Sequence, residues 1–223
     1  MRLWQRLSVT LLLAAVLLLR AELAGAIAWV YVLKPLSTLL VIAVALPAAL
    51  DRGDAYGRLV GIALGCSLVG DVLLMLPSDQ FTGGLAAFLV AHLFYIGAFT
   101  RDGGFATAPA SALPLAAMGT IVLALIWPVP GPLRLPVIAY MLVILTMAWQ
   151  ALERSRQGAH EGAWWAAVGA LLFVTSDSAL ALARFRGDFP GARAVVLGTY
   201  FLAQWMIATS ALVRAGRLAT PPR

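Results

Sequence analysis

Residues 64–77, LGCSLVGDVLLMLP, place one aspartate, Asp71, inside an otherwise apolar stretch. An ionised carboxylate in hydrocarbon is costly, so such a residue usually faces the protein interior and has a partner or a function. Residues 169–185, GALLFVTSDSALALARF, hold Asp177 in the same kind of setting. We interpret the chain as a membrane scaffold that brings the two aspartates together. The alternative is that each one only hydrogen-bonds a neighbouring helix.

The composition is that of a membrane protein with several spans. Of the 223 residues, 62% are hydrophobic and 12% are charged, whereas soluble domains carry about 25% charged residues. The single cysteine, Cys66, excludes an internal disulfide and a site with several cysteine ligands. The net charge of +6 comes from 15 arginines and one lysine, scattered over loops. They form no basic stripe, so nucleic-acid binding is not expected.

Eight apolar stretches have the length of membrane-spanning helices, which need about 20 residues each. We therefore expect an all-α integral membrane protein in which residues 1–223 form one domain. Proline, glycine and charged residues mark the gaps, one of which runs from Glu153 to Gly162, and no gap has room for a soluble domain. The expected spans are residues 4–20, 31–50, 58–76, 83–100, 109–127, 133–151, 163–184 and 194–214.

The first span has a second interpretation. Arg2 and Arg6 precede a leucine-rich run that ends at Ala24-Gly25-Ala26, a pattern that also describes a secretory signal peptide. Its removal would leave seven spans. Arg20 and Glu22 interrupt the approach to the cleavage site, which favours retention of the span.

The arginines predict the orientation of the spans. With eight spans both termini lie on one side of the membrane, and that side carries ten arginines against five on the other. Positively charged loops are preferentially cytoplasmic. Both termini are therefore expected in the cytoplasm, with the chain in the cell (plasma) membrane.

The two halves of the chain resemble each other weakly. Asp71 is followed 21 residues later by His92 in the next span, and Asp177 is followed 23 residues later by Tyr200 in the next span. This spacing suggests two four-helix parallel repeats with the site between them, an arrangement also known from transporters.

Six polar side chains from six spans fall at similar depths. At 1.5 Å per residue they lie about 5 to 13 Å below the outer boundary of the membrane. Unrelated contacts between helices would scatter in depth, and the inner half has no ionisable residue of comparable depth. We therefore predict one polar cavity that opens outward or sideways into the outer leaflet. The six residues are Lys34, Asp71, His92, Tyr140, Asp177 and Tyr200.

Asp71 and Asp177 are the predicted catalytic pair. Two carboxylates in one poorly hydrated site cannot both ionise easily, so one is expected to stay protonated near neutral pH. That gives one acid and one base, the arrangement that cleaves glycosides and related acetal-like bonds. His92 is a candidate catalytic base or orienting residue, or else a structural histidine.

Lys34 and three tyrosines are candidate substrate-binding residues. Lys34 binds a phosphate headgroup, pairs with an aspartate or extends to the membrane surface, and the sequence leaves all three open. Tyr95, Tyr140 and Tyr200 lie in spans, where tyrosines more often anchor interfaces or hydrogen-bond across helices.

Three other enzyme classes do not fit the sequence. A zinc hydrolase of the ceramidase type needs several intramembrane histidines, and this chain has two, of which His160 lies in a loop. An intramembrane aspartyl protease of the presenilin type needs Gly-x-Gly-Asp, but Leu68 occupies the first glycine position. No Gly-x-Ser-x-Gly elbow of a serine lipase occurs. No metal site is expected.

Five blocks together resemble the YhhN-like family of membrane proteins, which includes the lysoplasmalogenases. Their order and spacing carry the resemblance, which covers nearly the whole chain after the first span, although residues 101–132 match only in hydropathy. The blocks are KPLST (34–38), SLVGDVLLMLP (67–77), F-x-x-G-L-x-x-F-x-x-x-H-x-x-Y (81–95), LLFVTSDSALALARF (171–185) and GTYFLAQ (198–204).

The resemblance implies eight spans and hydrolysis of the vinyl ether bond of a lysoplasmalogen, or of a related ether lipid or lysolipid, in the membrane. The products would be a fatty aldehyde and a glycerophospho-ethanolamine or -choline. A protonated aspartate can donate the proton that starts the reaction, and an ionised one can stabilise the resulting cation and activate water, so no metal or organic cofactor is required. By position, the functional candidates are Lys34, Asp71, His92, Tyr95, Asp177 and Tyr200.

Two other function classes compete with this hydrolase. A lipid or small-molecule transporter would share the repeat and the charges within the membrane. A purely structural membrane protein is the third alternative. Hydrolysis of a lysolipid by the purified protein, lost on one aspartate change, separates the enzyme from both.

Overall fold

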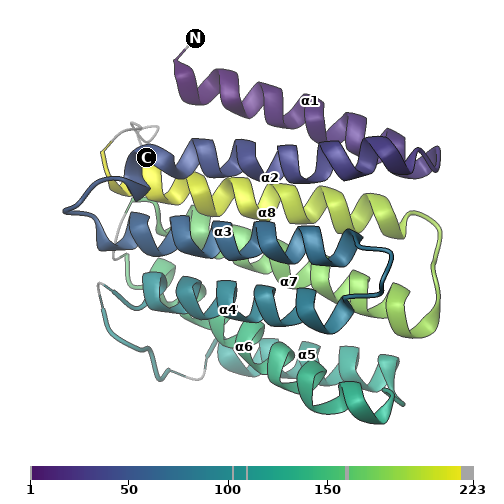
Figure 1. Cartoon of the computed structure of the whole chain (residues 1–223). Helices are drawn as coiled ribbons and strands as arrows, with labels where there is room; N and C mark the ends of the chain where they lie inside the picture. The colour runs from purple at the N-terminus through teal and green to yellow at the C-terminus, as the bar shows by residue number, and fades with distance from the viewer. Residues whose placement is uncertain (1, 102, 109, 159–160, 217–223) are drawn as a thin grey trace.

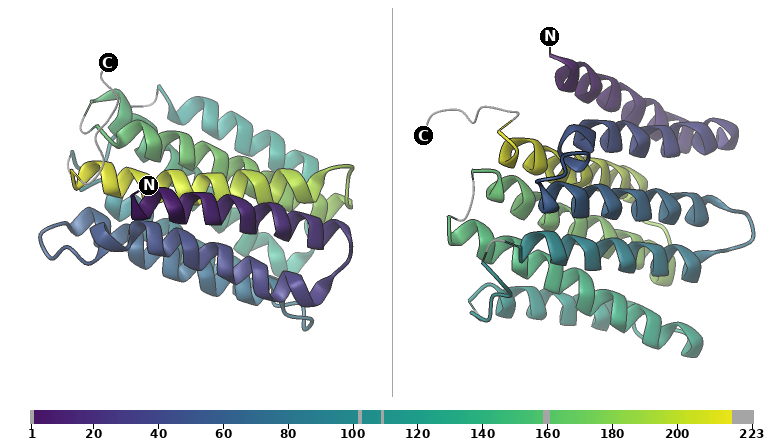
Figure 2. Two further views of the ribbon diagram at one scale, coloured as in Figure 1. Left: turned by 90° about the horizontal axis from the view of Figure 1, so that it is seen from above. Right: turned by 60° about the vertical axis from the view of Figure 1, so that its left-hand side comes forward.

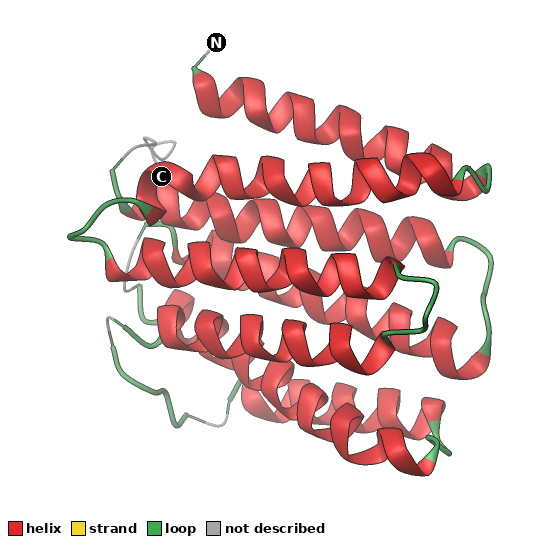
Figure 3. Cartoon of the chain, viewed as in Figure 1, coloured by secondary structure: helices red, strands yellow, loops and turns green. Residues whose placement is uncertain are grey.

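The computed structural model describes residues 2–101, 103–108, 110–158 and 161–216. All regular structure within these residues is helical, as Figure 3 shows, so the predicted all-α class is confirmed. Eight helices follow one another: α1 (Leu3–Leu23), α2 (Ile27–Ala49), α3 (Ala55–Met75), α4 (Phe81–Phe99), α5 (Ala112–Ile126), α6 (Gly131–Arg156), α7 (Ala163–Arg186) and α8 (Ala192–Arg214).

Most of these helices can cross a membrane by length and composition. Six are long and apolar enough, namely α2, α3, α4, α6, α7 and α8. The outer face of α1 exposes Leu12, Leu13 and Leu17, as a surface in contact with lipid does. The chain is therefore a multi-pass membrane protein.

Two predicted boundaries need correction. The span expected over 109–127 is the shorter helix α5, whose 15 residues extend about 22 Å against roughly 30 Å of bilayer hydrocarbon. The gap expected from Glu153 onward begins too early, because α6 continues to Arg156. Glu153 and Arg154, in the last turn of α6, are both buried.

The helices run back and forth, and the two described ends of the chain lie at the same end of the bundle (Figure 1). Helix α8 is central, because it packs against α1, α2, α3 and α7. Helix α1 forms one edge of the bundle, and α5 and α6 lie toward the opposite edge (Figures 1 and 2).

Small residues allow the closest helix contacts. A Cβ atom added to Gly169 of α7 would lie 2.9 Å from the carbonyl oxygen of Ala203 in α8, and one added to Gly70 of α3 would lie 2.6 Å from the ring of Phe88 in α4. Close approach at small residues is the usual way in which membrane helices pack. Gly70 precedes Asp71, so this contact also fixes the helix beside the aspartate.

The helix pairs follow the predicted repeat in part. α3 pairs with α4 as α7 pairs with α8, and the contact of α2 with α8 has its counterpart in that of α6 with α4. The first helix of each half breaks the correspondence, because α1 packs against α2 and α8 whereas α5 packs against α6 and α7.

Candidate functional site

A cavity of about 320 Å³ lies among helices α3 to α8, toward the end of the bundle that holds the loop between α3 and α4. Lys34 of α2 also reaches its wall. The cavity is amphipathic. Its polar wall includes Lys34, Asp71, Tyr140, Asp177 and Tyr200, and its apolar wall includes Met118 and Val122 of α5 and Met141, Ile144 and Leu145 of α6.

Asp71 is buried and surrounded by donors. The hydroxyl groups of Thr38 and Tyr200 each donate to its Oδ2 atom, at 2.6 Å. Lys34 Nζ lies 3.5 Å from its Oδ1 atom. Both oxygens therefore have a partner, and these partners come from two other helices, α2 and α8. Charge-assisted contacts of this kind stabilise the ionised carboxylate.

Lys34 thus adopts one of the three arrangements that the sequence left open, the pair with an aspartate. Its side chain is 14% exposed. Thr38 lies one helical turn further along α2, so both donors face Asp71 from the same side of that helix. Thr38 was missed by the sequence reasoning, although its place in the KPLST block, four residues after Lys34, is the signal that could have identified it.

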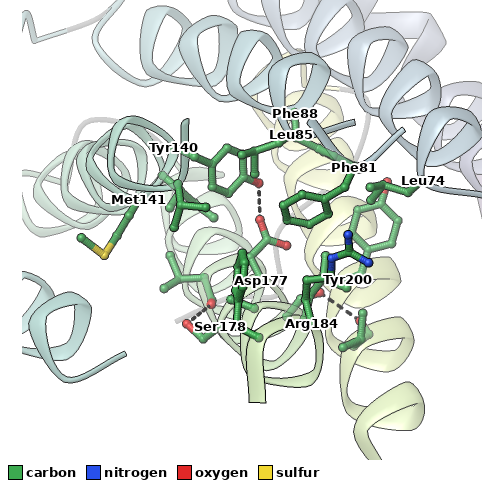
Figure 4. A pocket seen from close by; sticks show the side chains of 18 of the residues that line it. Leu74, Phe81, Leu85, Phe88, Tyr140, Met141, Asp177, Ser178, Arg184 and Tyr200 are labelled. Carbon is green, nitrogen blue, oxygen red and sulfur yellow. Dashed lines mark hydrogen bonds between the residues drawn. The ribbon is translucent and has the colours of Figure 1, made fainter. Parts of the chain in front are cut away.

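Asp177 is partly buried and has a sparser environment. The hydroxyl group of Tyr140 in α6 donates to its Oδ2 atom, and Figure 4 shows these two side chains pointing toward one another at the cavity. Its neighbours Ser176 and Ser178 donate to backbone carbonyls instead. No cation pairs with Asp177 among the residues that the structure describes. The two aspartates therefore share one cavity but differ in what surrounds them.

Tyr95 lies behind the cavity wall and acts on it through another residue. Its hydroxyl donates to Gln204 Oε1 at 2.8 Å, and Gln204 Nε2 donates to the hydroxyl of Tyr200 at 2.9 Å. Tyr200 in turn donates to Asp71. This chain of hydrogen bonds makes Tyr95 and Gln204 residues that position Tyr200. Gln204 was also missed from the sequence.

His92 is fully buried and does not line the cavity. Its ring packs against Phe173 at 4.7 Å and against Tyr140 at 5.3 Å between centroids. Neither ring nitrogen has a side-chain hydrogen-bond partner in the described part of the chain. The structure therefore brings five of the seven predicted site residues to the cavity and leaves His92 and Tyr95 behind it.

This arrangement suits acid and base chemistry on an amphipathic molecule. Asp71 has two hydroxyl donors and an ammonium group, contacts that favour its ionised form. Asp177 accepts from one neutral phenol, so its second oxygen can carry a proton toward the cavity. The apolar wall can bury a hydrocarbon chain next to both carboxyl groups.

The known proteins that resemble this chain all point to one family. The profile of the YhhN family matches residues 29–211. Lysoplasmalogenase TMEM86B of Sus scrofa is 39% identical over 166 residues, which cover 73% of this chain and 67% of that protein. Lysoplasmalogenase TMEM86A of Homo sapiens is 34% identical over 68% of this chain and 64% of that protein. The uncharacterized membrane protein YhhN of Escherichia coli O157:H7 is 30% identical over 82% and 86%. No solved structure matches the chain.

Proposed function

The chain belongs to the YhhN family, and from this premise we propose that it is a membrane hydrolase of the lysoplasmalogenase type. Its substrate is the vinyl ether bond of a lysoplasmalogen or a related ether lysolipid. The observation that supports this proposal most is the single cavity that joins two differently paired aspartates to an apolar wall. A lysolipid needs both parts, because it is a hydrocarbon chain with a reactive ether next to a polar headgroup.

The reaction begins with Asp177. Its protonated carboxyl transfers a proton to the β carbon of the vinyl ether, which becomes an oxocarbenium ion. The Asp71 carboxylate, held by Lys34, Thr38 and Tyr200, stabilises the positive charge that develops. Asp177 is left ionised and hydrogen-bonded to Tyr140.

Water then completes the cleavage. As a water molecule adds to the cationic carbon, Asp177 accepts one of its protons and so returns to its starting state. The resulting hemiacetal transfers its hydroxyl proton to the ether oxygen, and the bond between the carbon and that oxygen breaks. The products are a fatty aldehyde and the glycerophospho-alcohol. These steps use only the two carboxyl groups and water.

The orientation is part of the proposal. The ten-to-five arginine split favours cytoplasmic termini in the cell membrane. The cavity lies toward the opposite end of the bundle from the termini, so it opens toward the outer leaflet.

The experiment that tests the proposed function is release of fatty aldehyde by the purified protein. A 1-alkenyl lysophosphoethanolamine is the substrate, and the 1-alkyl analogue, which has no vinyl group to protonate, is the control. We expect aldehyde from the first lipid and none from the second. Absence of aldehyde from the alkenyl lipid would contradict the proposal, and transport of the intact lipid across proteoliposomes would favour a transporter instead.

A further inference from the structure

The rim of the cavity carries a second pair of opposite charges. Arg184, in the last turn of α7, and Asp79, in the turn between α3 and α4, both line the cavity. Arg184 NH2 donates to Asp79 Oδ2 at 2.7 Å, and its guanidinium carbon lies 5.0 Å from the centre of the Phe81 ring. Figure 4 shows Arg184 beside Phe81 on the same wall as Asp177.

Arg184 is placed to meet a bound molecule. It follows Asp177 by seven residues, which is about two helical turns and about 10.5 Å along the same face of α7. Its side chain is 40% exposed, and Asp79 is its one hydrogen-bond partner in the described part of the chain. A guanidinium has five N–H donors in a planar fork, so most of them remain available.

Lys34 and Arg184 are the two cationic side chains among the residues that line this cavity. Lys34 lies against Asp71, deep in the site, so its charge is already compensated by a buried carboxylate. Arg184 also has a carboxylate partner, Asp79, but its side chain is 40% exposed against 14% for Lys34, so it is the better placed cation for an anionic group near the mouth. The guanidinium fork also matches phosphate oxygens better than an ammonium group does.

The connectivity of a lysophospholipid fits this spacing. One glycerol unit separates the ether oxygen from the phosphate, so a lipid with its vinyl ether at Asp177 extends its phosphate along α7 toward Arg184. In an ethanolamine or choline headgroup a cationic amine follows the phosphate, and Asp79 is the carboxylate beside Arg184. A purely anionic headgroup would instead bring its charge near Asp79, which disfavours it.

We propose that the Arg184–Asp79 pair is a receptor for a zwitterionic glycerophospho-headgroup, in which Arg184 binds the phosphate and Asp79 the amine. The proposal rests on the proposed function for the class of lipid that occupies the cavity. On this proposal Arg184 and Asp79, and not Lys34, determine which headgroup the protein binds.

A binding experiment tests this inference separately from catalysis. Three short-chain 1-alkyl ligands that cannot be cleaved are titrated calorimetrically into the purified protein: the lysophosphoethanolamine, the lysophosphate and the alkylglycerol. Arg184→Gln should lower the affinity for the two phosphate-bearing ligands about fivefold and leave that for the alkylglycerol unchanged. The effect is moderate because a half-exposed charge contributes less to the binding free energy than a buried one. Asp79→Asn should weaken the lysophosphoethanolamine and strengthen the lysophosphate.

The chain offers a matched control in Arg193. This arginine also pairs with a carboxylate, Glu22, at 3.3 Å, and its side chain is 52% exposed, but it does not line the cavity. Arg193→Gln should therefore leave all three affinities unchanged. Unchanged phosphate binding in Arg184→Gln, or an equal loss for the alkylglycerol, overturns the inference. Neither result depends on hydrolysis, so failure of the proposed function is detected independently by the aldehyde assay.

Discussion

Two buried polar clusters occupy opposite ends of the bundle, and they differ in access. The cavity cluster is formed by Lys34, Thr38, Asp71, Tyr140, Asp177 and Tyr200. The terminal cluster is formed by Asp54, Tyr56, Arg154, Ser210 and Arg214. Helices α3, α6 and α8 contribute to both, and on α3 the distance from Tyr56 to Asp71 is 15 residues, about 22 Å of helix.

The terminal cluster is largely buried, and its residues contact one another. The guanidinium carbons of Arg154 and Arg214 lie 4.6 Å and 5.0 Å from the centre of the Tyr56 ring. Arg214 NH1 donates to Asp54 Oδ1 at 3.0 Å, and the Tyr56 and Ser210 hydroxyls are 2.7 Å apart. None of these residues lines the cavity. Burial of charge therefore does not by itself mark a candidate site, and the cavity cluster differs in that its carboxyl groups reach an amphipathic cavity.

The largest expected effect is on the rate, at the cavity cluster. Asp177→Asn removes the proton donor but keeps the shape and a partner for Tyr140, so aldehyde release should fall by about 10²- to 10⁴-fold. The melting temperature in detergent should stay near that of the wild type.

Asp71→Asn should lower the rate of aldehyde release by a similar factor. Combining it with Lys34→Met, which removes the cation left without a carboxylate, should restore stability but not activity.

The next largest effect is on stability, at the terminal cluster. Asp54 is the N-cap of α3, where it accepts from the backbone of Tyr56, and it also pairs with Arg214. Asp54→Ala removes both contacts and should lower the free energy of unfolding by about 1 to 3 kcal/mol. Thermal unfolding in detergent measures this loss. If kcat falls as strongly as in Asp177→Asn, the distinction between the two clusters is wrong.

A smaller effect separates the residues that touch the cavity from those behind it. Tyr200→Phe removes a donor to Asp71 and should lower kcat about tenfold, as expected for a lost hydrogen bond to a charged group. Tyr95→Phe removes the bond to Gln204 and none to Asp71, so its effect should be about threefold. Equal losses in the two variants would show that Tyr95 acts on the substrate directly.

The smallest effect concerns the apolar wall. Val122→Trp adds volume on α5 where the hydrocarbon chain is expected, and should raise KM about threefold for a long chain while leaving a short-chain substrate unaffected. Rates measured over a series of chain lengths check this expectation. The same increase for every chain length would place the hydrocarbon elsewhere.

The sequence predicted the helices well and identified five of the side chains that line the cavity. Asp71, Asp177 and Lys34 stand out because a charge in an apolar run is conspicuous, and the positions of Tyr140 and Tyr200 follow from counting along the helices. Depth does not determine which way a helix face points, because that depends on how neighbouring helices pack. For this reason His92, which has the expected depth on α4, lies behind the cavity, and so does Tyr95.

Other residues escaped prediction for different reasons. Thr38 and Gln204 are neutral, so they do not stand out in an apolar run as a charge does, and only their places in the KPLST and GTYFLAQ blocks mark them. Arg184 and Asp79 flank spans, where charged residues are expected in any membrane protein, and their role depends on a turn brought next to the end of α7. The sequence pattern predicted a loop that begins at Glu153. Helix α6 instead continues through Glu153 and Arg154. Both are buried, and Ser111 donates to Glu153.

The central claim is that Asp71 and Asp177 act as one unit in a single cavity. The most direct test compares kcat for aldehyde release in Asp71→Asn, Asp177→Asn and the double variant. Because residues that act as a unit have non-additive effects, the double variant should be no slower than the more damaged single variant. Losses that multiply in the double variant, or near-normal turnover in either single one, would contradict the claim.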